Sequence, residues 1–147
     1  MSAPARAVKR SVSFAIFRPG DRAEVLVVQR PPDDEDLPNA WGLPAGSLLP
    51  GEDWADAVRR AGRDKLGVEL SVGDELNRGF LERPAYTLEM RLLEAGIVTG
   101  EPRVPQSLAG VTQYQAWRWG TGETLVAAAE RGSLCSRLFL EVRPSRA

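Results

Sequence analysis

Apolar and polar residues alternate along several short segments of the chain, as they do in strands that bury one face. Within residues 11–17, the side chains of Val12, Phe14 and Ile16 fall on one side and predict such a strand. Residues 24–30 are more continuously apolar, which is typical of a strand covered on both faces. Further strands are expected at residues 41–46, 68–72, 79–82, 86–98 and 114–119.

The longest helical pattern runs over residues 52–66 and is followed by Gly67, which suits the cap at a helix C-terminus. Trp54, Val58 and Ala61 share one face of this helix, so we predict that this face packs in the core. Two shorter helices are expected at residues 121–131 and 133–142.

Strands that alternate with a few helices predict an α/β fold. The length of 147 residues fits one domain, which we place at residues 11–142, with a flexible tail at residues 1–10 and another at residues 143–147. The acidic and proline-rich segment at residues 31–38 is expected to be a solvated loop. The alternative is that its acids supply ligands to a metal ion.

Composition removes several classes of function. The formal net charge of −1 gives no reason to expect binding to nucleic acid or to a membrane surface, and no apolar run is long enough to span a bilayer. The chain has no histidine, which argues against zinc chemistry and against a Ser-His or Cys-His nucleophile. A single cysteine, Cys135, fits a reducing compartment, and we expect a cytoplasmic protein.

Glycine, glutamate and arginine recur at a characteristic spacing in the centre of the chain. Gly46 is followed after five residues by Glu52 and after seven more by Arg60, with Gly67 and Val68 beyond a further spacer. This segment, with the flanking WGLPAG and PGE, resembles the Nudix box, in which a loop, a helix and a second loop bind metal ions against a diphosphate. The resemblance covers most of the chain and implies an α/β/α sandwich around a mixed β-sheet.

The acidic part of the box departs from the family pattern. In the family the arginine is followed by glutamate, an aliphatic residue, any residue and two glutamates; here these positions are Ala61, Gly62, Arg63, Asp64 and Lys65. Positions 61, 64 and 65 share one helix face. Three carboxylates at these positions would bind Mg²⁺ or Mn²⁺. This chain offers one carboxylate beside an ammonium. Gly62 costs a helix about 1 kcal/mol relative to alanine, and either permits close packing or marks relaxed constraint.

The resemblance implies a set of candidate site residues. The metal ligands would be the carbonyl of Ala45 and the carboxylates of Glu52 and Asp64. The catalytic residues would be Glu52, Asp64 and Glu89, and the substrate-binding residues would be Arg30, Arg60 and Lys65.

Each candidate also has a structural alternative. Asp64 could pair with Arg60 on a solvated helix face, and Glu89 could face solvent on its strand, with Glu82 as a second choice of acid. Lys65 could be a surface lysine, or a cation that binds phosphate where the metal would sit. A shifted acidic cluster of Glu52 with Asp53 and Asp56 is a minor alternative.

Two functions follow from the resemblance. The first is a Nudix hydrolase that uses water to cleave a nucleoside diphosphate linked to another moiety, with Mg²⁺ or Mn²⁺ as cofactor and weak or altered activity because most box acids are missing. The second is a non-catalytic protein that binds a nucleotide or a phosphorylated metabolite. In both, the partner is a small nucleotide or diphosphate ligand, and a homodimer is compatible with the family.

Overall fold

A mixed β-sheet forms the centre of the computed structural model, which describes residues 6–106 and 113–142. Its strands are β1 (Val8–Arg18), β2 (Asp21–Gln29), β3 (Trp41–Gly42), β4 (Ala45–Ser47), β5 (Glu69–Glu82), β6 (Thr87–Thr99) and β7 (Ala116–Gly120). The helices are α1 (Trp54–Ala61), continued by a π-helical turn (Gly62–Leu66), then a 3-10 turn (Gly122–Leu125), α2 (Val126–Glu130) and α3 (Leu134–Val142).

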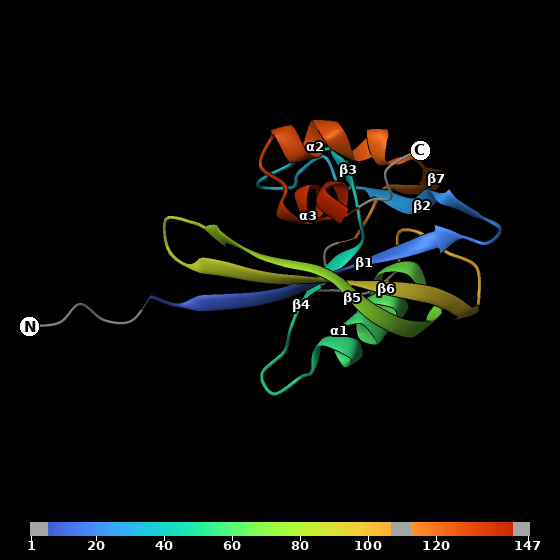
Figure 1. Cartoon of the computed structure of the whole chain (residues 1–147), viewed down its shortest axis with the longest axis horizontal. Coiled ribbons are helices and arrows are strands. Elements are labelled where there is room, and N and C mark those ends of the chain that lie inside the picture. Colours follow the sequence, from blue (N-terminus) through green and yellow to red (C-terminus); the bar gives the residue numbers. More distant parts are fainter. Residues whose placement is uncertain (1–5, 107–112, 143–147) are drawn as a thin grey trace, which may run out of the picture.

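The strand order is β3-β2-β1-β6-β5, with β4 paired to β1 and β7 paired to β2. Strands β1 and β6 run parallel, whereas the other pairs are antiparallel. Helix α1 covers one face of the sheet, and α2 and α3 lie on the opposite side (Figure 1). The predicted α/β/α sandwich with a mixed sheet is therefore confirmed.

Two apolar cores separate the sheet from its helices. Alternate residues of β1 serve the two faces: Phe14 belongs to the core under α1, and Ala15 to the core under α3. In α1, Val58 and Ala61 are 0% and 1% exposed, which confirms the predicted core face. No helix in the described ranges is long and apolar enough to cross a membrane.

Several predicted boundaries are wrong. The strands expected at residues 68–72 and 79–82 are one strand, β5, because irregular pairing with β6 carries the backbone through the polar residues between them. The tail expected at residues 1–10 contains the start of β1, where Lys9 pairs with Leu88 and Arg10 with Glu89. The tail expected at residues 143–147 lies outside the described residues.

The segment at residues 31–38 is only partly solvated, contrary to the prediction. One carboxylate oxygen of Asp34 accepts hydrogen bonds from the backbone N–H groups of Asp36 and Leu37, at 3.3 and 2.9 Å. Leu37 is 5% exposed and packs with Ala40 and Ala128. The loop packs because the carboxylate of Asp34 satisfies its backbone donors.

Gly62 has a packing role. A Cβ atom at this position would lie 2.5 Å from Leu70 Cδ1 and 3.3 Å from the carbonyl oxygen of Val68, so a side chain here would crowd the close approach of the π-helical turn to β5. Gly67 has a φ of 69° and ends the turn in the left-handed region, which confirms the predicted C-terminal cap.

Candidate functional site

The glutamate and arginine of the box form one tight pair. Glu52 immediately precedes Asp53, the N-cap of α1, and its carboxylate accepts hydrogen bonds from Arg60 Nε and Nη2 at 2.9 and 3.0 Å. The same carboxylate accepts from the backbone N–H of Leu49 at 3.0 Å. The Arg60 guanidinium lowers the pKa of Glu52, with the Leu49 N–H as a smaller cause. The carboxylate oxygens of Glu52 are therefore already used as hydrogen-bond acceptors within the protein.

Arg60 links the other parts of the box. Its Nη2 donates to the carbonyl oxygen of Ser47 at 2.6 Å, and its Nη1 lies 3.8 Å from the Asp64 carboxylate. The second of these contacts agrees with the alternative in which Asp64 pairs with that arginine. Both acids of the box therefore face one guanidinium.

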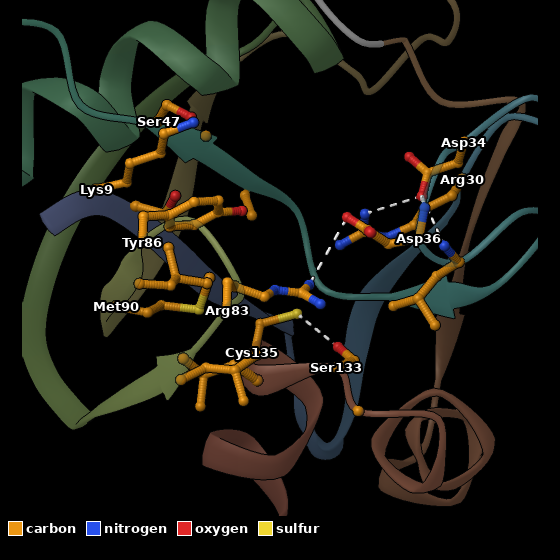
Figure 2. Close-up of a pocket in the computed structure, with 18 of the residues that line it drawn as sticks. Lys9, Arg30, Asp34, Asp36, Ser47, Arg83, Tyr86, Met90, Ser133 and Cys135 are labelled. Atoms are coloured by element: carbon orange, nitrogen blue, oxygen red, sulfur yellow. Dashed lines mark hydrogen bonds and ion pairs between the residues drawn. The ribbon is translucent and has the colours of Figure 1, made fainter. Parts of the chain in front are cut away.

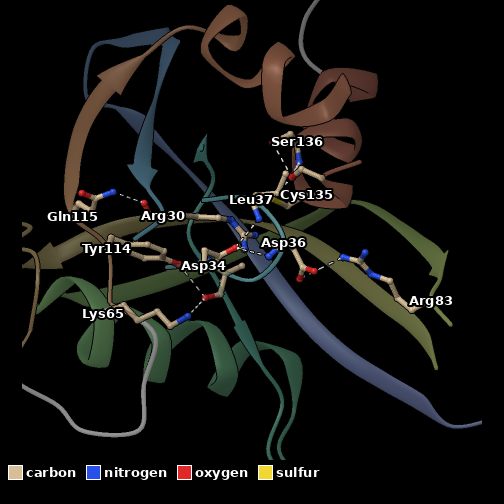
Figure 3. A network of polar contacts seen from close by, with 12 residues as sticks. Arg30, Asp34, Asp36, Leu37, Lys65, Arg83, Tyr114, Gln115, Cys135 and Ser136 are labelled. Atoms are coloured by element: carbon tan, nitrogen blue, oxygen red, sulfur yellow. Dashed lines mark hydrogen bonds and ion pairs between the residues drawn. The ribbon is translucent and has the colours of Figure 1, made fainter. Parts of the chain in front are cut away.

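Lys65 contacts the backbone oxygen that the resemblance assigns to a metal. Its Nζ donates to the carbonyl oxygen of Ala45 at 2.7 Å (Figure 3). The hydroxyl of Tyr114 donates to the same oxygen at 3.2 Å and accepts from the Ala45 N–H at 3.0 Å. The Tyr114 ring also lies 5.3 Å from the ammonium. Two donors therefore already occupy the Ala45 carbonyl.

The predicted ligand set does not fit a divalent metal. The Ala45 oxygen accepts from an ammonium, Glu52 is bound by Arg60, and Asp64 faces the same arginine. Within residues 6–106 and 113–142, no group of three or more acidic, cysteine or histidine side chains could hold a metal ion. A cation placed here would be repelled by two fixed positive charges and would have too few free oxygens.

Glu89 lies apart from these residues. It stands in β6 between Leu88 and Met90, which line a pocket, so the pleat directs its side chain to the opposite face. Its Oε1 accepts from Arg10 Nε at 2.8 Å, and its side chain is 16% exposed. Among the described contacts, none joins Glu89 to Glu52 or Asp64, so the structure does not bring the three candidate catalytic residues together.

Glu82, the second choice of acid, is also engaged elsewhere. It forms an ion pair with Arg6 at 2.9 Å and accepts a hydrogen bond from the Thr87 hydroxyl. Its side chain is 69% exposed. The geometry therefore gives no reason to prefer Glu82 over Glu89 as a catalytic acid.

Lys65 lines a pocket of about 320 Å³. Figure 2 shows this pocket with other lining residues, among them Lys9, Arg30 and Arg83. The pocket extends from β4 and the loop at residues 31–38 to the start of α3. Its charged lining residues are Lys9, Arg30, Asp34, Asp36, Lys65 and Arg83, and its apolar lining includes Leu81, Leu88 and Met90. Four cationic and two anionic side chains make this pocket suitable for a negatively charged ligand.

Of the three predicted substrate-binding residues, Arg30 and Lys65 line the pocket, and Arg60 is absent from its lining. Sequence reasoning missed Lys9, which fell in the predicted tail, and gave Tyr114 no role in the site. The polar Lys9-Arg10 pair before an alternating strand could have been read as the strand's first residues, but only pairing with β6 places Lys9 in the pocket.

Comparison with known proteins identifies the family to which the fold belongs. Residues 8–130 match the model of the NUDIX domain. The chain belongs to the Nudix family. An RNA pyrophosphohydrolase of Pseudomonas putida (strain GB-1) is 27% identical over 125 residues, covering 73% of this chain and 74% of that protein.

Solved structures show the same fold. The MutT protein from Methanosarcina mazei Go1 superposes with a TM-score of 0.69 at 18% identity, covering 88% of this Nudix chain and 91% of the other. The E. coli ORF135 protein gives a TM-score of 0.68 at 22% identity and covers 98% of both chains. At these identities, the structural likeness concerns the fold alone.

Proposed function

We propose that this Nudix-family protein binds a phosphorylated small molecule, of the nucleotide or phosphorylated-metabolite class, in the pocket beside Lys65 and without a divalent metal. The observation that carries the proposal is the 2.7 Å hydrogen bond from Lys65 Nζ to the Ala45 carbonyl oxygen. The ammonium is the cation at the position that the family resemblance gives to a metal. A bound phosphate oxygen would receive its remaining N–H donors.

Fixed charge supports this function over metal-dependent hydrolysis. A divalent ion near Ala45 would have to displace the Lys65 ammonium and leave it unpaired in a half-buried position. Without the ion, the site lacks the Lewis acid and the activated water that such hydrolysis requires. Ligand binding needs neither, because the pocket already carries an excess of positive charge.

Metal-dependent diphosphate hydrolysis is the second candidate, and one observation favours it. The curated relative in Pseudomonas putida carries the name RNA pyrophosphohydrolase and aligns with nearly three quarters of this chain. For this chain, hydrolysis would depend on Glu52 and Asp64 being released from Arg60 to bind Mg²⁺ or Mn²⁺. That competition predicts slow turnover at best.

Isothermal titration with ADP-ribose tests the proposal, with EDTA in one series and Mg²⁺ in another. We expect equal affinity in both series and at least about tenfold weaker binding for Lys65→Met, because a charge-assisted hydrogen bond contributes about 1.5–3 kcal/mol. Arg137→Met removes one charge from an exposed α3 position outside the pocket and should leave the affinity unchanged. Binding only with Mg²⁺, together with hydrolysis that Asp64→Asn abolishes, would establish the hydrolase instead.

A further inference from the structure

The two lysines of the chain share one pocket. Lys9 and Lys65 are the only lysines among nineteen basic residues, and the other seventeen are arginines. Both line the same cavity, although they lie 56 positions apart in the sequence and come from β1 and from the turn after α1. The fold thus brings to one place every side-chain ammonium that the chain has.

These two ammonium groups are not neutralised by acids. The ion pairs between described side chains are made by arginines, and two of them involve the pocket: Arg30 lies 3.4 Å from Asp34, and Arg83 lies 3.7 Å from Asp36. Lys65 contacts a carbonyl oxygen and an aromatic ring instead. Lys9 Nζ lies over the ring of Tyr86 at 4.4 Å. The excess positive charge of the pocket therefore belongs to the lysines.

The two lysines lie towards opposite ends of β4. Lys65 contacts the carbonyl oxygen of Ala45 at the start of this strand. Lys9 lies in β1 two residues before Ser11, which pairs with Ser47 at the end of β4, and its ammonium lies over the Tyr86 ring (Figure 2). Two residues along a strand span about 7 Å. The two ammonium groups are thus separated along one wall of the pocket, an arrangement that suits a ligand with more than one anionic group.

We propose that Lys9 is a second anion-binding residue, so that the ligand carries at least two phosphate or equivalent anionic groups, one on Lys65 and another on Lys9. This inference rests on the proposed function of the pocket. The Tyr86 ring holds the Lys9 ammonium at the pocket wall without cancelling its charge. The apolar residues Leu88 and Met90 lie beside it and would contact the remainder of the ligand.

Titration of metal-free protein with orthophosphate and with tripolyphosphate, at constant ionic strength, tests the role of Lys9. We expect the wild type to bind tripolyphosphate at least about tenfold more tightly than orthophosphate, as two charge-assisted contacts replace one. Lys9→Met should reduce this preference to less than about threefold and leave orthophosphate binding within twofold. Lys9→Arg, which keeps the charge, should retain most of the preference, and Arg137→Met should change neither affinity.

The outcomes separate the two proposals. If Lys9→Met keeps the wild-type preference while Lys65→Met weakens both anions, Lys9 is not an anchor but the binding pocket stands. If neither anion binds to the wild type and ADP-ribose also fails, the proposed function is refuted and the role of Lys9 with it. Circular dichroism and thermal unfolding of each variant show whether a loss of binding reflects a loss of fold.

Discussion

Gly62 is a position at which helix propensity and packing predict opposite effects of the same substitution. Replacing a helical glycine by alanine stabilises a helix by about 1 kcal/mol. At Gly62, however, the added Cβ would lie 2.5 and 2.8 Å from Cδ1 and Cγ of Leu70, a side chain that is 4% exposed. Overpacking of this kind costs about 1–3 kcal/mol. We therefore expect Gly62→Ala to lower the free energy of unfolding by about 1 kcal/mol.

A double-mutant cycle identifies the cause. Leu70→Ala alone should cost about 2–5 kcal/mol, because it leaves a cavity in the core under α1. In the double variant, Gly62→Ala with Leu70→Ala, the cavity has room for the new methyl group. The loss of unfolding free energy should therefore be smaller than the sum of the two single losses by at least about 1 kcal/mol. Gly73→Ala is the matched control, since its Cβ would meet nothing nearer than 3.4 Å.

Urea unfolding followed by tryptophan fluorescence measures the wild type and the four variants under one set of conditions. Gly73→Ala should be neutral or stabilising by up to about 1 kcal/mol. A Gly62→Ala protein more stable than the wild type, with no coupling to Leu70, would refute the packing explanation and leave helix propensity as the dominant effect.

Three further predictions concern the site. Glu52→Gln should lower stability at pH 7 by about 2 kcal/mol in urea unfolding. Because Arg60 lowers the folded-state pKa of Glu52, the wild type loses this extra stability as the pH falls below about 4.3. The free energies of unfolding of the wild type and Glu52→Gln should therefore become equal in acid. A difference that stays constant with pH would argue against the Glu52–Arg60 pair. Tyr114→Phe leaves the Ala45 N–H without its acceptor and should cost about 1–2 kcal/mol in thermal unfolding. Glu89→Gln should leave ADP-ribose affinity within twofold by calorimetry, since its side chain points away from the pocket.

The fold and the box were predictable from sequence because their signals are local. The spacing of Gly46, Glu52 and Arg60, together with the capped helix that follows, places a loop and a helix without knowledge of the rest of the chain. Gly67 at the helix end was predictable for the same reason, since a left-handed residue there is a property of a few consecutive residues.

The pocket depends on contacts between distant segments, which one sequence does not reveal. The contact of Lys65 with Ala45 spans 20 residues, and Tyr114 reaches the same carbonyl across 69. Lys9 enters the pocket only through the parallel pairing of β1 with β6. Glu89 was predicted on the correct strand. The face of the sheet on which its side chain lies depends on the pairing register of β6, and a shift of that register by one residue would move the side chain to the other face.

The Arg60 and Lys65 contacts have a consequence for the rate at which a ligand can bind. The two box acids, Glu52 and Asp64, and the two box cations carry equal and opposite charge, and three of the four make direct hydrogen bonds within the protein. These contacts join the loop, the helix and β4 to one another. Binding then orders little additional chain, so most of the interaction energy is available as affinity. Association should accordingly be a single fast step whose rate falls with salt, as expected for an anion attracted to a preformed cationic pocket.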